Sequence, residues 1–312
     1  MRIFVDDELD AAYRQDGYVV VRLMESEQAA EIDAAARRHL PRDLPPHENV
    51  TFISYGQPEL QWIDDLVGRA VDEALVPLLD EMRRFHPSLI VKPAGERPVP
   101  PHVHPIFTLE QAASTVFCWC ALEDTDESNG AIQVLPGSHK LFEIMPMYGQ
   151  VPYFLPCFDQ IAERMETLNL RAGEAVLFDE SLIHGSVANP SARNRIALAT
   201  HCIKRKLQPI TLFREGNGQY RVCDTGMDFG YQYHTRQEEL DPSGLWPTLG
   251  FVDDVHRLVE ADEFFERLTS GERISLTYPL MPRREPLQEA PRRAGLLARA
   301  RDALRQRVLA RA

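Results

Sequence analysis

The sequence predicts a mainly β protein with flanking helices, and two features of the chain support this prediction. From about residue 88 onward, short apolar runs alternate with turn-forming stretches such as "PAG", "ESNG" and "PGSH". The runs are "LIVK" (89–92), "STVFCWCAL" (114–122), "AIQVL" (131–135), "EAVLF" (174–178), "RIALATHCI" (195–203) and "PITLF" (209–213). Many short strands with such turns indicate a sandwich or barrel rather than parallel βαβ units. Asn129-Gly130 further predicts a hairpin turn.

The flanking helices are predicted in the N-terminal part of the chain. A short helix should end at a turn formed by Asp16-Gly17, and a β-branched strand should follow at residues 18–23. Ser26 is placed to cap a helix that has acids early and basic residues late, as the helix dipole prefers. Apolar residues at helical spacing predict another helix over residues 68–84, which Pro77 should bend or interrupt.

Composition excludes several classes of protein. The 312 residues are 44% hydrophobic and 26% charged, as in an ordinary soluble protein with a well-buried core. A net charge of −13 argues against binding to nucleic acid or to an anionic membrane. We see no transmembrane segment and no signal peptide. The five cysteines lack a CxxC pair, and Cys118 and Cys120 lie in an apolar run, so free thiols in a reducing cytoplasm are expected.

One domain is expected over residues 1–285. It would comprise a helical N-terminal part (1–86), a β core (87–235) and a C-terminal extension (236–285). Residues 286–312 predict a basic amphipathic helix, "RRAGLLARARDALRQRVLARA", with arginines around an apolar face. This helix could bind an anionic membrane, an acidic partner or the acidic body of its own protein. We favour docking within the protein or between the subunits of a homo-oligomer, with a solvated tail as the alternative.

Histidines carry the first indication of chemistry. His102 and His104 are separated by one residue in "PPHVH", so on a strand they would point to the same side. His184 in "FDESLIHGS" could supply a third ligand if the two segments were neighbours in a barrel. The pattern therefore predicts a three-histidine metal site. The alternative is that His104 points away and bonds to the backbone, which would leave two protein ligands.

Longer stretches of the chain resemble a known family. They are "DGYVVVRLM", "VKPAG", "PPHVH", "WCALEDTDESNGAIQVLPGSHK" and "GEAVLFDESLIHGSVANPSARNRIAL". Over roughly residues 10 to 205 the chain resembles the phytanoyl-CoA dioxygenase family of Fe(II)- and 2-oxoglutarate-dependent oxygenases. The resemblance implies a double-stranded β-helix (jelly roll, cupin-like) core, Fe(II) as the metal, and 2-oxoglutarate and O2 as co-substrates.

The resemblance also implies roles for individual residues. His102 and His184 fall on the first and last iron-binding histidines of the family. Arg195 falls on the basic residue that pairs with the distal carboxylate of 2-oxoglutarate, which an arginine fork can bind bidentately. Ser186 matches a hydroxyl that helps to bind this co-substrate, and Lys92 matches a lysine that faces the same pocket.

The sequence departs from the family at His104. The family pattern is His-x-Asp, which completes a two-histidine, one-carboxylate triad. A histidine at the acid position makes the site one unit more positive and is also familiar from zinc sites. We expect His104 to be an atypical third ligand. It would fill the coordination position that the family's halogenating relatives leave free, which argues against halogenation.

The expected substrate is a small, largely apolar organic molecule of specialised metabolism, and we predict that one of its C–H bonds is hydroxylated. We do not transfer phytanoyl-CoA, because no basic CoA-binding patch is evident. Aromatic residues of two segments are candidates for substrate contact or, equally, for packing: Tyr148, Tyr153, Phe154, Phe229 and Tyr231. His139 is assigned to a turn, and His201 to the core or the back of the pocket.

Three alternatives to this function stay open. One is a three-histidine dioxygenase that does not use 2-oxoglutarate, against which the position of Arg195 argues. Another is a non-catalytic binding protein on the same fold. A zinc hydrolase is the most distant, because no obvious general base accompanies the histidines.

Overall fold

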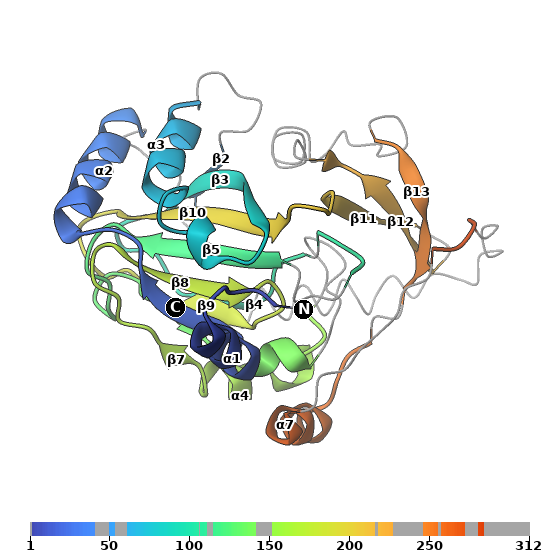
Figure 1. Ribbon diagram of the computed structural model, residues 1–312. Coiled ribbons are helices and arrows are strands. Elements are labelled where there is room, and N and C mark those ends of the chain that lie inside the picture. The colour runs from blue at the N-terminus through green and yellow to red at the C-terminus, as the bar shows by residue number, and fades with distance from the viewer. Residues whose placement is uncertain are drawn as a thin grey trace.

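Two antiparallel sheets facing each other form the centre of the protein (Figure 1). The structure is a computed structural model. It describes residues 2–40, 50–53, 61–105, 107–110, 115–141, 152–215, 218–226, 246–254, 257–271 and 280–283. Side chains from both sheets, among them Trp119 and Val134, share one buried cluster between them. This arrangement is the predicted jelly-roll core.

The larger sheet has six strands. Their order is β1 (Tyr18–Arg22), β8 (Glu174–Asp179), β5 (Thr115–Ala121), β10 (Arg195–Lys204), β3 (Met82–Lys92) and β2 (Val50–Ile53). The smaller sheet runs β4 (Val99–His102), β9 (His184–Ser186), β6 (Ile132–Val134) and β7 (Glu166–Thr167). The N-terminal part, expected to be helical apart from the strand at 18–23, therefore also supplies β2 and the first half of β3 to this larger sheet.

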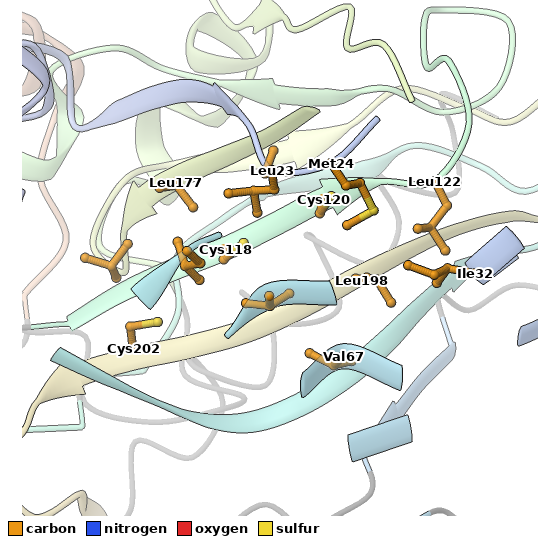
Figure 2. Close-up of a cluster of buried hydrophobic side chains, with 14 of the residues drawn as sticks. Leu23, Met24, Ile32, Val67, Cys118, Cys120, Leu122, Leu177, Leu198 and Cys202 are labelled. Atoms are coloured by element: carbon orange, nitrogen blue, oxygen red, sulfur yellow. The ribbon is translucent and has the colours of Figure 1, made fainter. Parts of the chain in front are cut away.

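Strand β5 shows how the sequence builds the two faces of the larger sheet. Successive side chains of a strand point to opposite faces. Phe117 and Trp119 point between the sheets, whereas Cys118 and Cys120 face the outer side. Figure 2 shows the two thiols in this outer cluster with Ile32 and other apolar side chains. All five cysteines are free and buried, as the sequence predicts.

Helices α1 (Asp7–Asp16), α2 (Ser26–His39) and α3 (Gln61–Val71) contribute to the outer cluster. Helix α1 ends as predicted, at Gly17, whose φ of +85° is readily adopted by glycine. A Cβ at Gly17 would lie 2.4 Å from Nδ1 of His139, so the glycine also makes room for that ring. The prediction for the cap of α2 was wrong: Glu25 is the N-cap, and Ser26 is already the first helical residue.

The helix predicted over residues 68–84 was wrong beyond Val71. Helix α3 ends at Val71, a 3-10 turn, η2 (Val76–Leu78), follows, and Met82 begins strand β3. Pro77 has no N–H to continue an α-helix, and it occupies the first turn of η2 instead. Of the apolar residues with helical spacing, Val71, Leu75, Leu79 and Met82 are buried, whereas Leu78 in η2 is only partly buried.

The hairpin predicted at Asn129-Gly130 was also wrong. Strands β5 and β6 belong to different sheets, so the loop between them crosses from one sheet to the other. Asn129 folds this loop by accepting the Asp126 N–H (2.9 Å) and donating to the Asp124 carbonyl (2.8 Å). At Gly130, with φ of +92°, a Cβ would lie 2.4 Å from Cδ of Lys92. The glycine therefore lets the loop pass close to that side chain.

The C-terminal part adds a third sheet, with the three strands β11 (Ile210–Arg214), β12 (Gln219–Asp224) and β13 (Thr248–Asp253). Helix α7 (Ala261–Ser270) buries Phe264 in a cluster with η5 (Leu155–Cys157) and α4 (Phe158–Ala162). Earlier in the chain, the short 3-10 turn η4 (Ser138–Lys140) carries His139, in agreement with its assignment to a turn. The predicted basic helix 286–312 lies outside the described residues. In the described part of the chain, no helix has both the length and the apolar composition needed to cross a membrane.

Candidate active site

Three histidines meet between the two sheets, as the sequence predicts. His102 and His184 are directly opposite each other on β4 and β9, and their ring centres are 4.1 Å apart. His104 follows β4, with its ring centre 4.5 Å from that of His184. Ring nitrogens of all three lie within 4.8 Å of one another, a spacing at which one metal ion can be held.

Hydrogen bonds fix which nitrogen each ring offers. Nδ1 of His102 lies 2.9 Å from the Pro100 carbonyl, and Nδ1 of His184 lies 2.9 Å from the Leu182 carbonyl. A carbonyl can only accept, so both Nδ1 atoms carry the proton and both Nε2 atoms keep a free lone pair. Metal-binding histidines are typically held in this way.

The environment keeps two of these rings neutral. Burial, together with the neighbouring His104, lowers the pKa of His102 to about 4. Burial and the other two rings lower the pKa of His184 well below its ordinary value. A neutral imidazole is the form that binds metal.

Gly185 permits the close approach of β4 and β9. A Cβ at this position would lie only 2.6 Å from the carbonyl oxygen of Val99. The glycine therefore maintains the strand spacing at which His102 faces His184.

Two buried cations lie beside the histidines. Arg195 on β10 and Lys92 on β3 are cross-strand partners, and they are 2% and 0% exposed. Lys92 donates to the Ser186 hydroxyl (3.0 Å) and to the Arg97 carbonyl (2.8 Å). Because Ser186 is two residues after His184 on the same strand, it connects the cations to the histidine cluster.

Arg195 is incompletely satisfied. Within the described residues, its Nε and Nη1 atoms have no hydrogen-bond partner, and its guanidinium carbon lies 4.9 Å from the centre of the Trp119 ring. Burial lowers the pKa of Arg195 to about 10. Burial and the charge of Arg195 lower the pKa of Lys92 to about 7. Glu123 and Glu96 partly oppose these shifts, but neither cation forms a salt bridge with a described carboxylate. A buried charge without such a partner is costly, so this pocket fits an anionic ligand such as a dicarboxylate.

Sequence reasoning missed Glu180, which lies beside the third histidine. Its carboxylate is 1% exposed and accepts from Nδ1 of His104 and from Nδ1 of His201, both at 2.6 Å. Burial raises the pKa of this carboxyl, but the two imidazoles outweigh burial and hold it at about 2. The only signal in the sequence was its position four residues before His184. His201 lies behind His104 and interacts with Glu180, consistent with its predicted place at the back of the pocket.

The aromatic residues proposed for substrate contact are placed differently. Tyr153 and Phe154 are buried with Ile183 in the cluster beneath α4 and α7. Ile183 precedes His184 in the chain, so this cluster lies on the other face of the smaller sheet. Their burial there agrees with the packing alternative. Tyr148, Phe229 and Tyr231 lie outside the described residues.

Other rings surround the histidines. Phe117 is 4.5 Å from His104, Phe178 is 4.6 Å from His184, and Phe107 is 5.0 Å from His201, measured between ring centres. Phe117 and Phe178 stand in two of the predicted strands, "STVFCWCAL" and "EAVLF". Together the three rings give the site an apolar wall.

The fold and the site define a cupin-like protein with a histidine cluster that could hold a metal ion, and comparison with known families gives its membership. The profile described as phytanoyl-CoA dioxygenase (PhyH) matches residues 4–197. The chain belongs to this family, as the sequence motifs predicted. The cofactor and co-substrates expected for it, Fe(II), 2-oxoglutarate and O2, are those of the family.

Individual relatives are more distant. The peroxisomal phytanoyl-CoA dioxygenase of Rattus norvegicus is 26% identical over 209 residues, which cover 62% of this chain and 55% of that protein. The phytanoyl-CoA dioxygenase of Arabidopsis thaliana is 30% identical over 34% of this chain and 38% of that protein. The matched segment thus spans about half of the rat protein and less of the plant one. Because the rat relative is peroxisomal, a cytoplasmic location for this chain stays a prediction.

Solved structures confirm the fold. The 2-oxoglutarate-dependent epimerase SnoN from nogalamycin biosynthesis matches with a TM-score of 0.51 and 23% identity, over 66% of this chain and 84% of that one. The carbocyclase SnoK from the same biosynthesis matches with a TM-score of 0.51 and 18% identity, over 74% of this chain and 90% of that one. At these identities the likeness concerns the fold.

Proposed function

We propose that this protein is an Fe(II)- and 2-oxoglutarate-dependent oxygenase that hydroxylates a C–H bond of a small, largely apolar organic substrate. The observation that carries this proposal is the buried, incompletely paired Arg195 beside three converging histidines. A site that binds only a metal ion has no need of a buried arginine next to it. A site for a dicarboxylate that also chelates the metal needs such a cation to bind the distal carboxylate.

The metal would be held by Nε2 of His102, His104 and His184. All three are ligands of a kind that suits Fe(II), and the ring proton on Nδ1 of each is already engaged by a protein acceptor. Bound iron supplies the redox chemistry with O2. The protein provides the ligands, their orientation and an enclosed apolar setting.

The co-substrate would be anchored by the cations. Arg195 offers two free N–H donors to the distal carboxylate, and Trp119 supports the guanidinium from one side. Lys92 and Ser186 offer further polar contacts between this point and the histidines. The dianion would offset the positive charge of a metal bound by neutral ligands only.

The substrate class is inferred from the rings around the histidines. Phe107, Phe117 and Phe178 present apolar surface to the imidazoles of the site. Apolar walls with a few polar groups are typical of sites for small organic molecules. This supports a largely apolar substrate.

An anaerobic titration tests the proposal. Fe(II) and then 2-oxoglutarate are added to the protein, and the visible charge-transfer band of the chelate is followed. We expect a band with the native protein. Arg195→Ala should raise the 2-oxoglutarate concentration for half-saturation about 10- to 100-fold, since hydrogen bonds to charged groups contribute about 1.5–3 kcal/mol. Arg193→Ala, which removes an exposed arginine two residues earlier, before the start of β10, is the matched control.

The same titration separates the alternatives. Metal binding without a band would reject the use of 2-oxoglutarate and favour the three-histidine dioxygenase. Failure to bind either metal or 2-oxoglutarate would favour a non-catalytic binding protein. If the band appears, incubation in air with a panel of apolar compounds, analysed by mass spectrometry for succinate and for products about 16 Da heavier, tests hydroxylation.

A further inference from the structure

The residue that departs from the family pattern, His104, is held twice by Glu180. The backbone N–H of His104 donates to the Glu180 carbonyl at 2.9 Å. The imidazole of His104 bonds through Nδ1 to the Glu180 carboxylate at 2.6 Å. The first contact fixes the position of the residue, and the second fixes the orientation of its ring.

Glu180 is itself fixed. Its second carboxylate oxygen accepts from Nδ1 of His201, so both oxygens are engaged. The turn that carries it is closed by the Leu182 N–H, which donates to the Asp179 carbonyl at 2.8 Å. The Ser181 N–H also donates to the Asp179 carboxylate, at 3.0 Å. A buried carboxylate with two ring donors and a closed backbone turn has little freedom to move.

Glu180 also carries a charge that the metal ligands lack. His102 and His184 direct Nδ1 to neutral carbonyl groups, whereas His104 directs it to a carboxylate. A carboxylate that accepts from a ligating histidine makes that histidine a more basic ligand and fixes its tautomer. The family's acid ligand is absent at position 104, but an acid is present one imidazole ring farther out.

We propose that Glu180 is a positioning residue of the metal centre, which replaces the missing carboxylate ligand by orienting His104 and by placing a negative charge behind it. His201 holds Glu180 from the opposite side. This inference rests on the proposed function only in taking His104 as a metal ligand. It explains how a His-x-His motif can serve where the family has His-x-Asp.

The test is metal affinity, measured with Co(II) in the absence of 2-oxoglutarate. Dissociation constants come from competition with a chelator, and the Co(II) d–d absorption reports the ligand set. Glu180→Gln should weaken binding about 10- to 100-fold, the usual effect of removing such a hydrogen-bond partner. The amide can no longer accept from both rings, so one imidazole loses its acceptor. In a His104→Ala background, the same substitution should have no further effect, because Glu180 acts through His104.

A control removes a different buried carboxylate. Asp10 on α1 accepts the Ile3 and Phe4 N–H groups and bonds to none of the site residues. Asp10→Asn should leave the Co(II) dissociation constant unchanged. A loss of affinity in this variant equal to that of Glu180→Gln would overturn the proposal, because the effect would then be one of general stability.

Restoring the family's acid provides the sharper test. His104→Asp alone should bind Co(II) weakly, because it would place a second carboxylate near that of Glu180, and two buried like charges oppose each other. Adding Glu180→Gln should then tighten binding about tenfold or more. The same substitution thus weakens the native site and improves the His104→Asp site. A role of Glu180 in folding alone would weaken both, and that result would overturn the proposal.

Thermal melts show which variants fold. If Glu180→Gln does not fold alone, the comparison of His104→Asp with His104→Asp/Glu180→Gln decides: tighter binding by the double variant supports the proposal, and equal or weaker binding overturns it. A native protein that gives the 2-oxoglutarate band, with a Glu180→Gln variant of unchanged Co(II) affinity, overturns this inference and leaves the proposed function standing. A native protein that binds no metal overturns both.

Discussion

The proposed metal centre and the proposed co-substrate pocket share strand β9, but they differ in how their buried polar groups are paired. At the metal centre, Nδ1 of each of the three histidines has an acceptor, and both oxygens of Glu180 are engaged. In the co-substrate pocket, Arg195 keeps two nitrogens without a partner among the described residues. One region is organised before any ligand arrives, and the other carries an electrostatic cost that an anion would relieve. The first region therefore fixes the orientation of the metal ligands, and the second provides affinity for the anionic co-substrate.

Removal of a metal ligand should have the largest effect. Nδ1 of His184 is bonded to the Leu182 carbonyl, which leaves its Nε2 atom to bind the metal. A four-ligand site contributes about 10–16 kcal/mol, so loss of one ligand should cost on the order of 3 kcal/mol, or at least about 100-fold in affinity. Isothermal titration of His184→Ala with Co(II) measures this. His139→Gln, a buried histidine outside the cluster, should bind like the native protein.

Stability without ligands should rise with pH above neutrality, because of Lys92. Its folded pKa, about 7, lies below the ordinary 10.5 through burial and the charge of Arg195, against a smaller opposing effect of Glu96. Below about pH 7 both folded and unfolded states are protonated, and the buried charge destabilises the protein in full. Between about pH 7 and 10.5 the unfolded state binds more protons, so the free energy of unfolding increases by up to about 1.4 kcal/mol per pH unit.

Urea denaturation at about pH 6.5, 7.5 and 8.5 measures this rise. The contribution of Lys92 is the difference in free energy of unfolding between the native protein and Lys92→Met, whose side chain does not titrate. A difference that stays constant with pH would show that Lys92 does not titrate in this range. Saturating 2-oxoglutarate with metal should reduce the difference, because the dianion favours charged Lys92.

The spacing of the two metal-bearing strands can be disturbed at Gly185. A methyl group there meets the Val99 carbonyl at 2.6 Å, so β4 must move away from β9. Forced overpacking of this kind costs about 1–3 kcal/mol. Gly185→Ala should lower both the free energy of unfolding and the Co(II) affinity. Unchanged metal affinity in a destabilised variant would mean that the histidines do not depend on this contact.

Adjacent residues of β5 give the smallest and most selective effects. Trp119 faces Arg195, and Cys120 faces the outer cluster. Trp119→Leu should weaken 2-oxoglutarate binding about 2- to 30-fold, given about 0.5–2 kcal/mol for a cation–π contact. Cys120→Ala should cost only about 1 kcal/mol of stability and leave that binding unchanged. Equal effects of the two changes on 2-oxoglutarate binding would contradict the separation of the two faces.

The parts of this structure that could be predicted from the sequence are those set by local pattern. Strands β5, β8 and β10 are apolar on both faces because each lies between two buried layers, and such runs are easily recognised. Strand β2 and the first half of β3 were missed. In β3 the run "MRRFHP" mixes arginines with apolar residues, and helical spacing over 68–84 competed with the strand pattern.

The candidate site was predicted through its motifs, and its supporting residue was not. His102, His104 and His184 stand in recognisable stretches, and Arg195 follows at a familiar spacing. Glu180 is 76 residues from His104 and 21 from His201, so only the folded chain brings the three together. The hairpin at Asn129-Gly130 failed for a related reason: the turn residues were identified, but the local sequence does not show that the flanking strands belong to different sheets.

Strand β9 has a consequence for how this chain can change. Its three residues carry the proposed metal ligand His184, a glycine that admits the neighbouring strand, and the hydroxyl bonded to Lys92. Because side chains alternate along a strand, an insertion or deletion of one residue here would turn the hydroxyl or the imidazole to the opposite face. Length variation should therefore be tolerated on either side of His184–Ser186 but not within it. A library of single-residue insertions, selected for retained metal binding, should show a gap at these three positions.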